Sequence, residues 1–298
     1  MSHAGSVATG WRVRRTGNPD GMSDSAPTPP TPSKDSSDRP FALVTGASSG
    51  IGLELARQLA AHGHDLLVTA EDAGVEGVAD ELRSLGAEVT TFVADLRTGA
   101  GVESLYAATV AHGRPLAVVA LNAGIGRGGA FVDNGLEDEL DVIRLNVLGT
   151  VHLAKLVLDD MVLANAGRVL VTSSIASTMP GPFQTVYNAS KSFVQSFTEG
   201  LQTELAETEV TITSLMPGPT DTAFFSRAGM DDTVMGEGPK DDPAAVARQG
   251  YEALMAGKAK VAASSPGTKA TALAAAVLPD KVKALLHRVA AKPRGGGE

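Results

Sequence analysis

Tyr187 and Lys191 are four residues apart in a segment that predicts a helix, so both side chains project from one helix face. Ser174 follows the predicted strand before that helix. Chemistry at a carbonyl carbon needs a proton donor when hydride arrives and a base in the reverse direction. A free tyrosine is a weak acid with a pKa of about 10, and a nearby ammonium group favours its phenolate. The three side chains therefore suit proton transfer at a carbonyl, with the serine holding the substrate oxygen. Taken alone, the spacing is better explained by an ordinary helical Tyr–Lys pair.

A glycine-rich turn follows the first predicted strand and reads Thr45-Gly46-Ala47-Ser48-Ser49-Gly50-Ile51-Gly52. Glycine at such a turn permits positive φ angles and a close approach of the backbone to a ligand. The helix that follows begins with free N–H groups and the positive end of its dipole, which favours a pyrophosphate. Tight turns need glycine in any case, so it is the position after a buried strand that favours dinucleotide binding.

Polar residues follow the other predicted strands at the points where these end. They are Glu71, Asp72, Asp95, Asn122, Ser173 and Ser174. Polar residues often mark strand ends, and a single one would mean little. Their recurrence at successive strand ends is better explained by a shared cleft, because ligands of open α/β sheets bind beyond the carboxyl ends of the strands.

Apolar runs typical of strands alternate with segments of helical spacing between residues 41 and 215. Strands are expected over residues 41–45, 65–69, 89–93, 116–121, 168–172 and 210–215, and helices over 51–61, 75–85, 102–110, 134–164 and 184–206. This alternation predicts parallel strands joined by right-handed crossovers. Because the strands are apolar on both faces, the expected fold class is α/β, a single doubly wound parallel sheet flanked by helices on both faces.

Composition excludes several classes of function. The 298 residues carry a formal net charge of −9, which disfavours nucleic acid as the main partner. The chain has no cysteine, which rules out thiol chemistry, and its six histidines form no metal-binding motif, so no metal is expected. No apolar run is long enough for a transmembrane segment and no secretory signal is evident, which leaves a cytoplasmic location as the expectation.

The two ends of the chain differ from its middle. Residues 1–39 are rich in Ser, Pro, Gly, Asp and Arg, which predicts a disordered N-terminal tail. Residues 40–265 are expected to form the dinucleotide-binding and catalytic domain. Residues 266–298 are expected to form a helical C-terminal extension with a loose end. The basic amphipathic segment there, around 282–289, most simply covers its own domain, and membrane or partner contact is the alternative.

Several of these motifs occur together and in a fixed order. The chain contains T-G-x-x-x-G-x-G at 45–52, Asn122-Ala123-Gly124, Asn146 within L-N-V-L-G-T, Ser174 placed 187 − 174 = 13 positions before Tyr187, Y-x-x-x-K at 187–191, and Pro217-Gly218-Pro219-Thr220-Asp221-Thr222. With these motifs, the chain resembles the short-chain dehydrogenase/reductase family over about residues 41–265. It departs from the family pattern at Leu121, where an asparagine is often found.

The resemblance implies a role for each matching residue. Tyr187 would be the general acid and base, Lys191 would lower its pKa and bind the nicotinamide ribose, and Ser174 would polarise the substrate carbonyl. Asn146 would hold a water that relays protons. The cofactor would contact Gly46, Ser48, Ser49, Gly50, Ile51, Gly52, Glu71, Asp95, Leu96, Asn122, Ala123, Gly124, Tyr187, Lys191, Pro217, Gly218, Thr220 and Thr222. The implied reaction interconverts an alcohol and a ketone or aldehyde by hydride transfer.

The residues after the second predicted strand bear on the choice of cofactor. Glu71 can accept hydrogen bonds from ribose hydroxyls and would repel a 2′-phosphate, so NAD is preferred over NADP. The alternative is that Glu71 points to solvent while a basic residue such as Arg97 reaches in, which would make NADP possible.

Other features bear on the substrate and on assembly. Phe224, Phe225, Met230 and Met235 suit a lid over an apolar small-molecule substrate, opposite a wall formed by residues 175–182. The long helices suggest a homodimer or homotetramer by analogy. A cofactor-sensing protein that binds without turnover is the alternative function, and the intact set of Asn146, Ser174, Tyr187 and Lys191 favours the enzyme.

Overall fold

The computed structural model of the chain describes residues 39–265 and 278–294. A seven-stranded parallel sheet forms its centre, with the strand order β3-β2-β1-β4-β5-β6-β7. The strands are β1 (Phe41–Thr45), β2 (Asp65–Ala70), β3 (Val89–Val93), β4 (Leu116–Leu121), β5 (Gly167–Thr172), β6 (Val210–Pro217) and β7 (Lys260–Ala263). The predicted tail over residues 1–39 lies, except for Arg39, outside the described residues.

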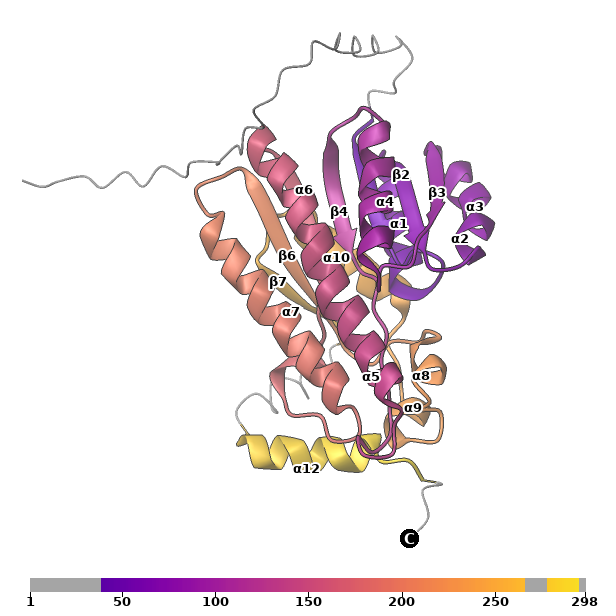
Figure 1. The fold of residues 1–298 in the computed structure, drawn as a ribbon, viewed down its shortest axis with the longest axis vertical. Helices are drawn as coiled ribbons and strands as arrows, with labels where there is room; N and C mark the ends of the chain where they lie inside the picture. The colour runs from indigo at the N-terminus through magenta and orange to yellow at the C-terminus, as the bar shows by residue number, and fades with distance from the viewer. Residues whose placement is uncertain (1–38, 266–277, 295–298) are drawn as a thin grey trace, which may run out of the picture. The chain divides into compact units, whose positions relative to one another are not determined.

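Helices follow most of the strands and cover both faces of the sheet (Figure 1). They are α1 (Gly50–Ala61), α2 (Gly74–Gly77), α3 (Ala79–Ser84), α4 (Gly99–Ala111), α5 (Leu136–Ile143), α6 (Thr150–Ala164), α7 (Thr185–Glu204), α8 (Phe224–Arg227), α9 (Val234–Glu237), α10 (Pro243–Met255) and α12 (Asp280–Ala291). A π-helical turn over Arg144–Gly149 joins α5 to α6, and a 3₁₀ turn covers Ile175–Thr178.

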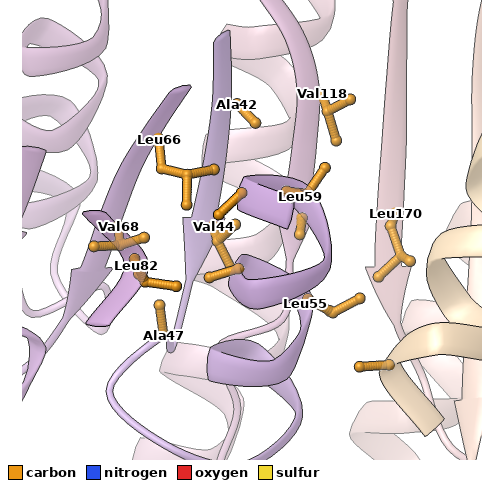
Figure 2. Close-up of a cluster of buried hydrophobic side chains, with 14 of the residues drawn as sticks. Ala42, Val44, Ala47, Leu55, Leu59, Leu66, Val68, Leu82, Val118 and Leu170 are labelled. Carbon is orange, nitrogen blue, oxygen red and sulfur yellow. The ribbon is translucent and has the colours of Figure 1, made fainter. Parts of the chain in front are cut away.

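Alternate residues of the strands β1 to β6 enter two separate cores. On β1, Ala42 and Val44 pack under α1, α3 and α10, as Figure 2 shows for α1 and Leu82 of α3. Phe41 and Leu43 point to the opposite face and pack under α4, α6 and α7. Because strand side chains alternate between faces, an apolar residue at every position is what a sheet buried on both sides requires. The predicted single doubly wound sheet is confirmed.

Strand order reverses between β1 and β4, which are neighbours in the sheet although β2 and β3 separate them in sequence. The connections after β1 and β4 leave in opposite directions across the sheet, which opens a crevice at their carboxyl ends. The glycine-rich turn after β1 and Asn122 after β4 both lie at this reversal.

The structure also departs from the expected elements in four places. The helix expected over 75–85 is split at Val78 into α2 and α3, and the one expected over 134–164 contains the π-helical turn. The helix α10 and the short edge strand β7 were not expected at all. An N-terminal signature of α10 was present in the sequence, since Asp242 caps the helix and Pro243 occupies its first turn.

The C-terminal helix α12 packs against α9 and buries His287 and Ala291. Val282, Leu285, Leu286 and Val289 remain exposed on it. Of the helices in residues 39–265 and 278–294, none is both long and apolar enough to cross a membrane.

Asp65 holds the base of the sheet together at the end opposite the crevice. Its side chain is 2% exposed, pairs with Arg114 at 2.9 Å and Arg39 at 3.3 Å, and accepts a hydrogen bond from the Glu88 amide at 3.0 Å. Removing one partner of a buried ion pair leaves the other charge uncompensated, so Asp65→Ala is expected to lower the free energy of unfolding by about 3 kcal/mol. Denaturant unfolding followed by circular dichroism measures this.

The matched control is Asp80→Ala, because Asp80 also pairs with an arginine, Arg83, but is 94% exposed. Exposed pairs contribute little, so its loss is expected to stay below about 0.5 kcal/mol. Equal losses for the two variants would contradict the structural role assigned to Asp65.

Candidate active site

A large pocket opens at the carboxyl ends of the strands and has a cavity volume of about 270 Å³. Nearly all the residues selected from the sequence line it. They are Gly46, Ser48, Ser49, Gly50, Ile51, Gly52, Glu71, Asp95, Leu96, Asn122, Ala123, Gly124, Ser174, Tyr187, Lys191, Pro217, Gly218, Thr220 and Thr222. Asn146 and the lid residue Met230 are the exceptions, and Asn146 lies behind the pocket wall. The structure thus brings together residues that are as much as 176 positions apart, from 222 − 46.

The glycine-rich turn fits closely between β1, β4 and the start of α1. Gly46 and Gly50 have φ angles of +65° and +57°, a region that side chains disfavour. A Cβ atom on Gly52 would lie 2.1 Å from the carbonyl oxygen of Gly46. Ser49, the N-cap residue of α1, makes no side-chain cap, so the first amides of the helix face the pocket without that partner. This backbone cradle is open to an anionic ligand.

Asn122 stabilises the turn, because its side chain is hydrogen-bonded within the protein and is not free in the pocket. Its Nδ2 donates to the Thr45 carbonyl at 3.2 Å, and its Oδ1 accepts from the Thr172 hydroxyl at 3.0 Å. The amides of Asn122 and Ala123 both donate to the Thr45 hydroxyl, at 2.9 and 3.0 Å. These bonds fix the ends of β1, β4 and β5 relative to one another.

The long helix α7 places Tyr187 and Lys191 on its pocket side, one turn apart. The Tyr187 side chain is 9% exposed and hydrogen-bonds with the Ser174 hydroxyl, which also accepts from the Ala176 amide at 3.0 Å. Nζ of Lys191 donates to the Thr172 carbonyl at 2.9 Å and lies 6.0 Å from the centre of the Tyr187 ring. The three side chains selected from the sequence therefore meet in one buried group.

Burial determines the proton affinity of this group. It raises the pKa of Tyr187 to about 12, and the hydrogen bond to Ser174 opposes the rise. It also lowers the pKa of Lys191 to about 8. The pKa of Tyr187 is thus shifted in the direction opposite to the one that a nearby ammonium favours, and the role of Lys191 toward Tyr187 stays a prediction. The lysine ammonium points at the Thr172 carbonyl, and removal of the phenol from water disfavours the phenolate.

Asn146 lies in the π-helical turn and connects it to the loop after β4. Its Oδ1 accepts from the Ile125 amide at 2.9 Å, while Nδ2 donates to the Ile125 carbonyl at 2.9 Å and to the Ser190 hydroxyl at 3.0 Å. A Cβ atom on Gly124 would lie 3.1 Å from this Oδ1 and 3.2 Å from Nζ of Lys191. Asn146 thus supports the wall next to Lys191 from behind.

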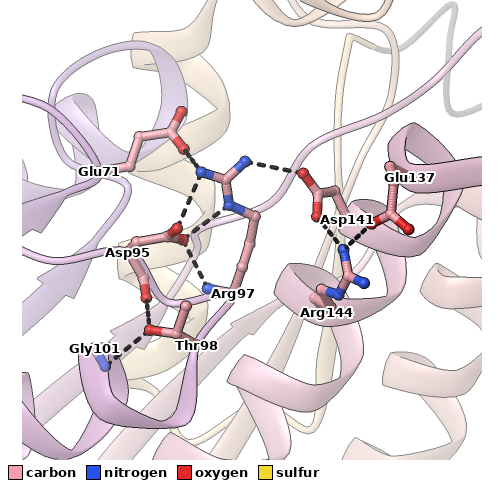
Figure 3. Close-up of polar contacts among 8 residues, drawn as sticks. All are labelled: Glu71, Asp95, Arg97, Thr98, Gly101, Glu137, Asp141 and Arg144. Atoms are coloured by element: carbon pink, nitrogen blue, oxygen red, sulfur yellow. Dashed lines mark hydrogen bonds and ion pairs between the residues drawn. The ribbon is translucent and has the colours of Figure 1, made fainter.

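Arg97 stands at the centre of a network of carboxylates at the other end of the pocket (Figure 3). It pairs with Asp95 at 2.9 Å, Asp141 at 3.1 Å and Glu71 at 3.4 Å. Hydrogen bonding to Asp95 raises the pKa of Arg97, and the same bond lowers the pKa of Asp95. Glu71 lines the pocket, as expected for the NAD-preferring alternative, whereas Arg97 is not among the lining residues and contacts Glu71 from behind.

The remaining wall is mainly apolar and comes from the segments expected to cover a substrate. The Phe224 ring packs on Tyr187 with 5.1 Å between ring centres. Phe225, Met235 and Met179 also line the cavity. Met230 does not, and instead lies in a small buried cluster with Phe225 and Ala228.

Sequence reasoning missed several residues that line the pocket, among them Thr172, Gln184, Arg227 and His287. Thr172 ends a predicted strand two positions before Ser174, and Gln184 begins a predicted helix three positions before Tyr187, so their places in the sequence were a usable indication. His287 is 100 positions beyond Tyr187, from 287 − 187, and nothing local connects the two.

The doubly wound sheet with a glycine-rich turn at its reversal defines a Rossmann-like α/β protein. The family model for short chain dehydrogenase matches residues 40–232. The oxidoreductase UcpA of Salmonella typhimurium is 33% identical over 215 residues, which cover 72% of this chain and 79% of that protein. The chain therefore belongs to the short-chain dehydrogenase/reductase family of oxidoreductases.

Solved structures agree with this family. A short-chain dehydrogenase/reductase from Burkholderia phymatum in complex with NAD has a TM-score of 0.72 and 26% identity, covering 79% of this chain and 92% of that one. A short-chain dehydrogenase from Sphingobium yanoikuyae in complex with NADPH has a TM-score of 0.71 and 27% identity, covering 80% and 93%. The similar structures thus include complexes with both nicotinamide cofactors.

Proposed function

We propose that the protein is an NAD(P)-dependent oxidoreductase that interconverts an alcohol and a ketone or aldehyde, with Tyr187 as the general acid and base. The observation that carries this proposal is that Tyr187, Ser174 and Lys191 share one pocket with the open backbone cradle of the glycine-rich turn. Proton transfer and dinucleotide binding are then adjacent.

The cradle fits the diphosphate of a dinucleotide. The uncapped start of α1 supplies amides and the positive end of a helix dipole, and the glycines leave the space that a side chain would fill. Glu71 and Asp95 suit the adenosine end, while Lys191 and residues 217–222 suit the nicotinamide end. A bound nicotinamide dinucleotide supplies the hydride for reduction or accepts it in oxidation.

The residues of this chain handle the proton. In reduction, the Tyr187 hydroxyl donates a proton to the carbonyl oxygen of the substrate as that oxygen gains electrons. The Ser174 hydroxyl orients the same oxygen, because it already hydrogen-bonds with Tyr187. A Tyr187 pKa of about 12 keeps the phenol protonated near neutral pH, which favours its role as an acid in carbonyl reduction.

The pH dependence of reduction follows from Lys191. The Lys191 ammonium stabilises the phenolate that Tyr187 becomes once it has given up its proton. Because the pKa of Lys191 is about 8, the positive charge of Lys191 is lost as the pH rises through about 8. The kcat/KM for ketone reduction is therefore expected to be flat below about pH 7 and to fall about tenfold per pH unit well above pH 8. The Lys191→Arg variant keeps its charge at all these pH values, so the same fall in that variant would contradict this assignment.

NAD(H) is the cofactor we propose, on the basis of Glu71. Its carboxylate lines the pocket and would lie close to a 2′-phosphate, although Arg97 partly neutralises it. The Glu71→Gln variant removes this negative charge, and Arg97 then has one carboxylate partner fewer. The ratio of the Kd for NADH to the Kd for NADPH is expected to rise by about tenfold or more in this variant, as measured by calorimetry.

Glu76→Gln is the matched control for that measurement, because Glu76 is exposed on α2, five residues along the chain, and does not line the pocket. It changes the net charge equally and is expected to leave the Kd ratio unchanged. An unchanged ratio in the Glu71 variant as well would contradict the assignment of Glu71.

The substrate we propose is a small molecule with an apolar carbon skeleton. Phe224, Phe225, Met179 and Met235 are among the residues that line the rest of the pocket, beyond those assigned to the cofactor. A homo-oligomer and a cytoplasmic location stay predictions. The face that suits a second copy of the chain carries the exposed side chains of Ile143, Leu148 and Phe193.

A further inference from the structure

His287, on the C-terminal helix α12, places a polar side chain in the wall of the pocket. The side chain is 5% exposed and lines the same cavity as Tyr187. Its Nδ1 lies 3.1 Å from the carbonyl oxygen of Pro182, in the loop before α7. The same helix packs on α9, which carries Met235 of the pocket wall. His287 therefore belongs to the part of the cavity that the lid and the 175–182 wall enclose.

The contact with Pro182 determines which ring nitrogen carries the proton. A carbonyl oxygen only accepts hydrogen bonds, so Nδ1 must be the donor, and Nε2 of the neutral ring is left with a free lone pair. Burial lowers the pKa of His287, which keeps the ring neutral near pH 7. His287 thus presents a hydrogen-bond acceptor.

This acceptor is buried and has no hydrogen-bond partner among the residues that the structure describes. His64 is a useful contrast within the same chain. It is 4% exposed and its Nδ1 also lies near a backbone carbonyl, that of Leu59 at 3.2 Å, but it does not line the pocket and its Nε2 is not a buried unpaired atom. A buried acceptor without a partner is unfavourable and is relieved by a ligand that donates to it.

The residues around His287 indicate which kind of ligand group would donate a hydrogen bond to its Nε2. Phe225, Ala228, Met230 and Ala291 form the apolar cluster at this end of the lid. Three carboxylates line the pocket. Glu71 and Asp95 pair with Arg97, and Asp72 accepts a hydrogen bond from the Gly74 amide at 2.8 Å. An uncharged donor on a carbon skeleton suits apolar neighbours better than an ammonium group, which would need a counter-charge.

We propose, on the basis of the proposed function, that Nε2 of His287 accepts a hydrogen bond from a hydroxyl group of the substrate. The substrate class is then a ketone that carries a second, unreactive hydroxyl, and the product is the corresponding diol. In the reaction, hydride adds to the carbonyl carbon, the C=O π bond breaks, and the oxygen takes the Tyr187 proton. The hydroxyl on His287 is unchanged, so His287 determines specificity and takes no part in the chemistry.

The test compares ω-hydroxy-2-alkanones of five to twelve carbons with their ω-methyl ethers, which keep the oxygen but lack the donor. For at least one chain length, the wild-type kcat/KM is expected to favour the hydroxy ketone by about tenfold. In His287→Phe this ratio is expected to fall to about one, while the kcat/KM for the ether changes by less than about threefold. His287→Gln, which can still accept a hydrogen bond, is expected to retain part of the preference.

His64→Phe is the matched control, since it removes a buried histidine outside the pocket and is expected to keep the preference. Histidine side-chain ¹H–¹⁵N spectra give a second readout that is independent of turnover. The Nε2 resonance that disappears in His287→Phe is expected to shift on addition of the preferred hydroxy ketone to the wild type and not on addition of its ether.

The outcomes separate the two proposals. Reduction of the ketones with no preference for the hydroxyl at any length, or a preference that persists in His287→Phe, overturns the role of His287 and leaves the proposed function intact. A wild-type protein that binds NADH or NADPH yet reduces no ketone of the series contradicts the proposed function itself, and the role of His287 with it.

Discussion

Replacing Tyr187 with phenylalanine is expected to lower kcat for ketone reduction by about 10³-fold while cofactor affinity changes little. The substitution removes only the hydroxyl, the group that would donate the proton and that hydrogen-bonds with Ser174. The ring stays and can still pack against Phe224. Steady-state kinetics, together with a calorimetric titration with NADH, separate the loss of chemistry from a loss of binding.

Tyr251→Phe is the matched control for this experiment. Tyr251 stacks on His62 with 4.4 Å between ring centres and does not line the pocket, so its loss is expected to leave kcat within about twofold. A Tyr187→Phe variant that retains a tenth or more of the wild-type kcat would contradict the assignment of the general acid.

Gly52→Ala is expected to weaken cofactor binding by about 100-fold or more. A Cβ atom at this position would lie 2.1 Å from the Gly46 carbonyl oxygen and 2.5 Å from Nδ2 of Asn122, and the first of these is backbone that cannot rotate away. The turn must therefore open, which moves the amides of α1 away from the diphosphate. Fluorescence titration with NADH measures the affinity, and far-ultraviolet circular dichroism checks the fold.

A glycine in open space gives the control for this substitution. A Cβ atom on Gly200, within α7, meets nothing within 4 Å, so Gly200→Ala is expected to leave affinity unchanged and to stabilise the protein by about 0.5–1 kcal/mol. If folded Gly52→Ala bound NADH as tightly as the wild type, the cradle could not be the dinucleotide site.

The sheet could be predicted because its strands follow one simple physical rule. A strand such as β1 is buried at all five positions and apolar at the first four, since both faces are covered, and polar or glycine residues follow it where the chain enters the crevice. The same rule places the glycine-rich turn, Asn122 and Ser174 at one edge of the sheet. The position of the pocket follows from the strand order, because that order brings these strand ends together.

The elements missed by sequence analysis lack such a pattern. The edge strand β7 has four residues, of which only Ala263 is fully buried, so there is too little periodicity to read. The π-helical turn over residues 144–149 depends on the contacts of Asn146 with Ile125 and Ser190, which no local propensity encodes. Tertiary contacts override local preference at such positions.

The substrate end of the pocket was the least predictable part for a related reason. The residues 282–289 read as a basic amphipathic helix, and that pattern describes only the exposed face of α12. The functional side chain is His287 on the opposite face, and its partner Pro182 is 105 positions away in the sequence. The pKa of Tyr187 likewise depends on burial, which residue spacing does not report.

The central claim is that Tyr187 and the cradle act together in hydride transfer, and transfer of a label tests it most directly. The wild-type protein is incubated with a ketone of the series above and NADH or NADPH that carries two deuterium atoms at carbon 4 of the nicotinamide, and the alcohol is analysed by mass spectrometry. We predict one deuterium on the carbinol carbon of the product with the wild type, and at the same reaction time about 10³-fold less labelled alcohol with Tyr187→Phe. Binding of both cofactors without any labelled alcohol from any ketone would contradict the account and favour a protein that senses the cofactor without turnover.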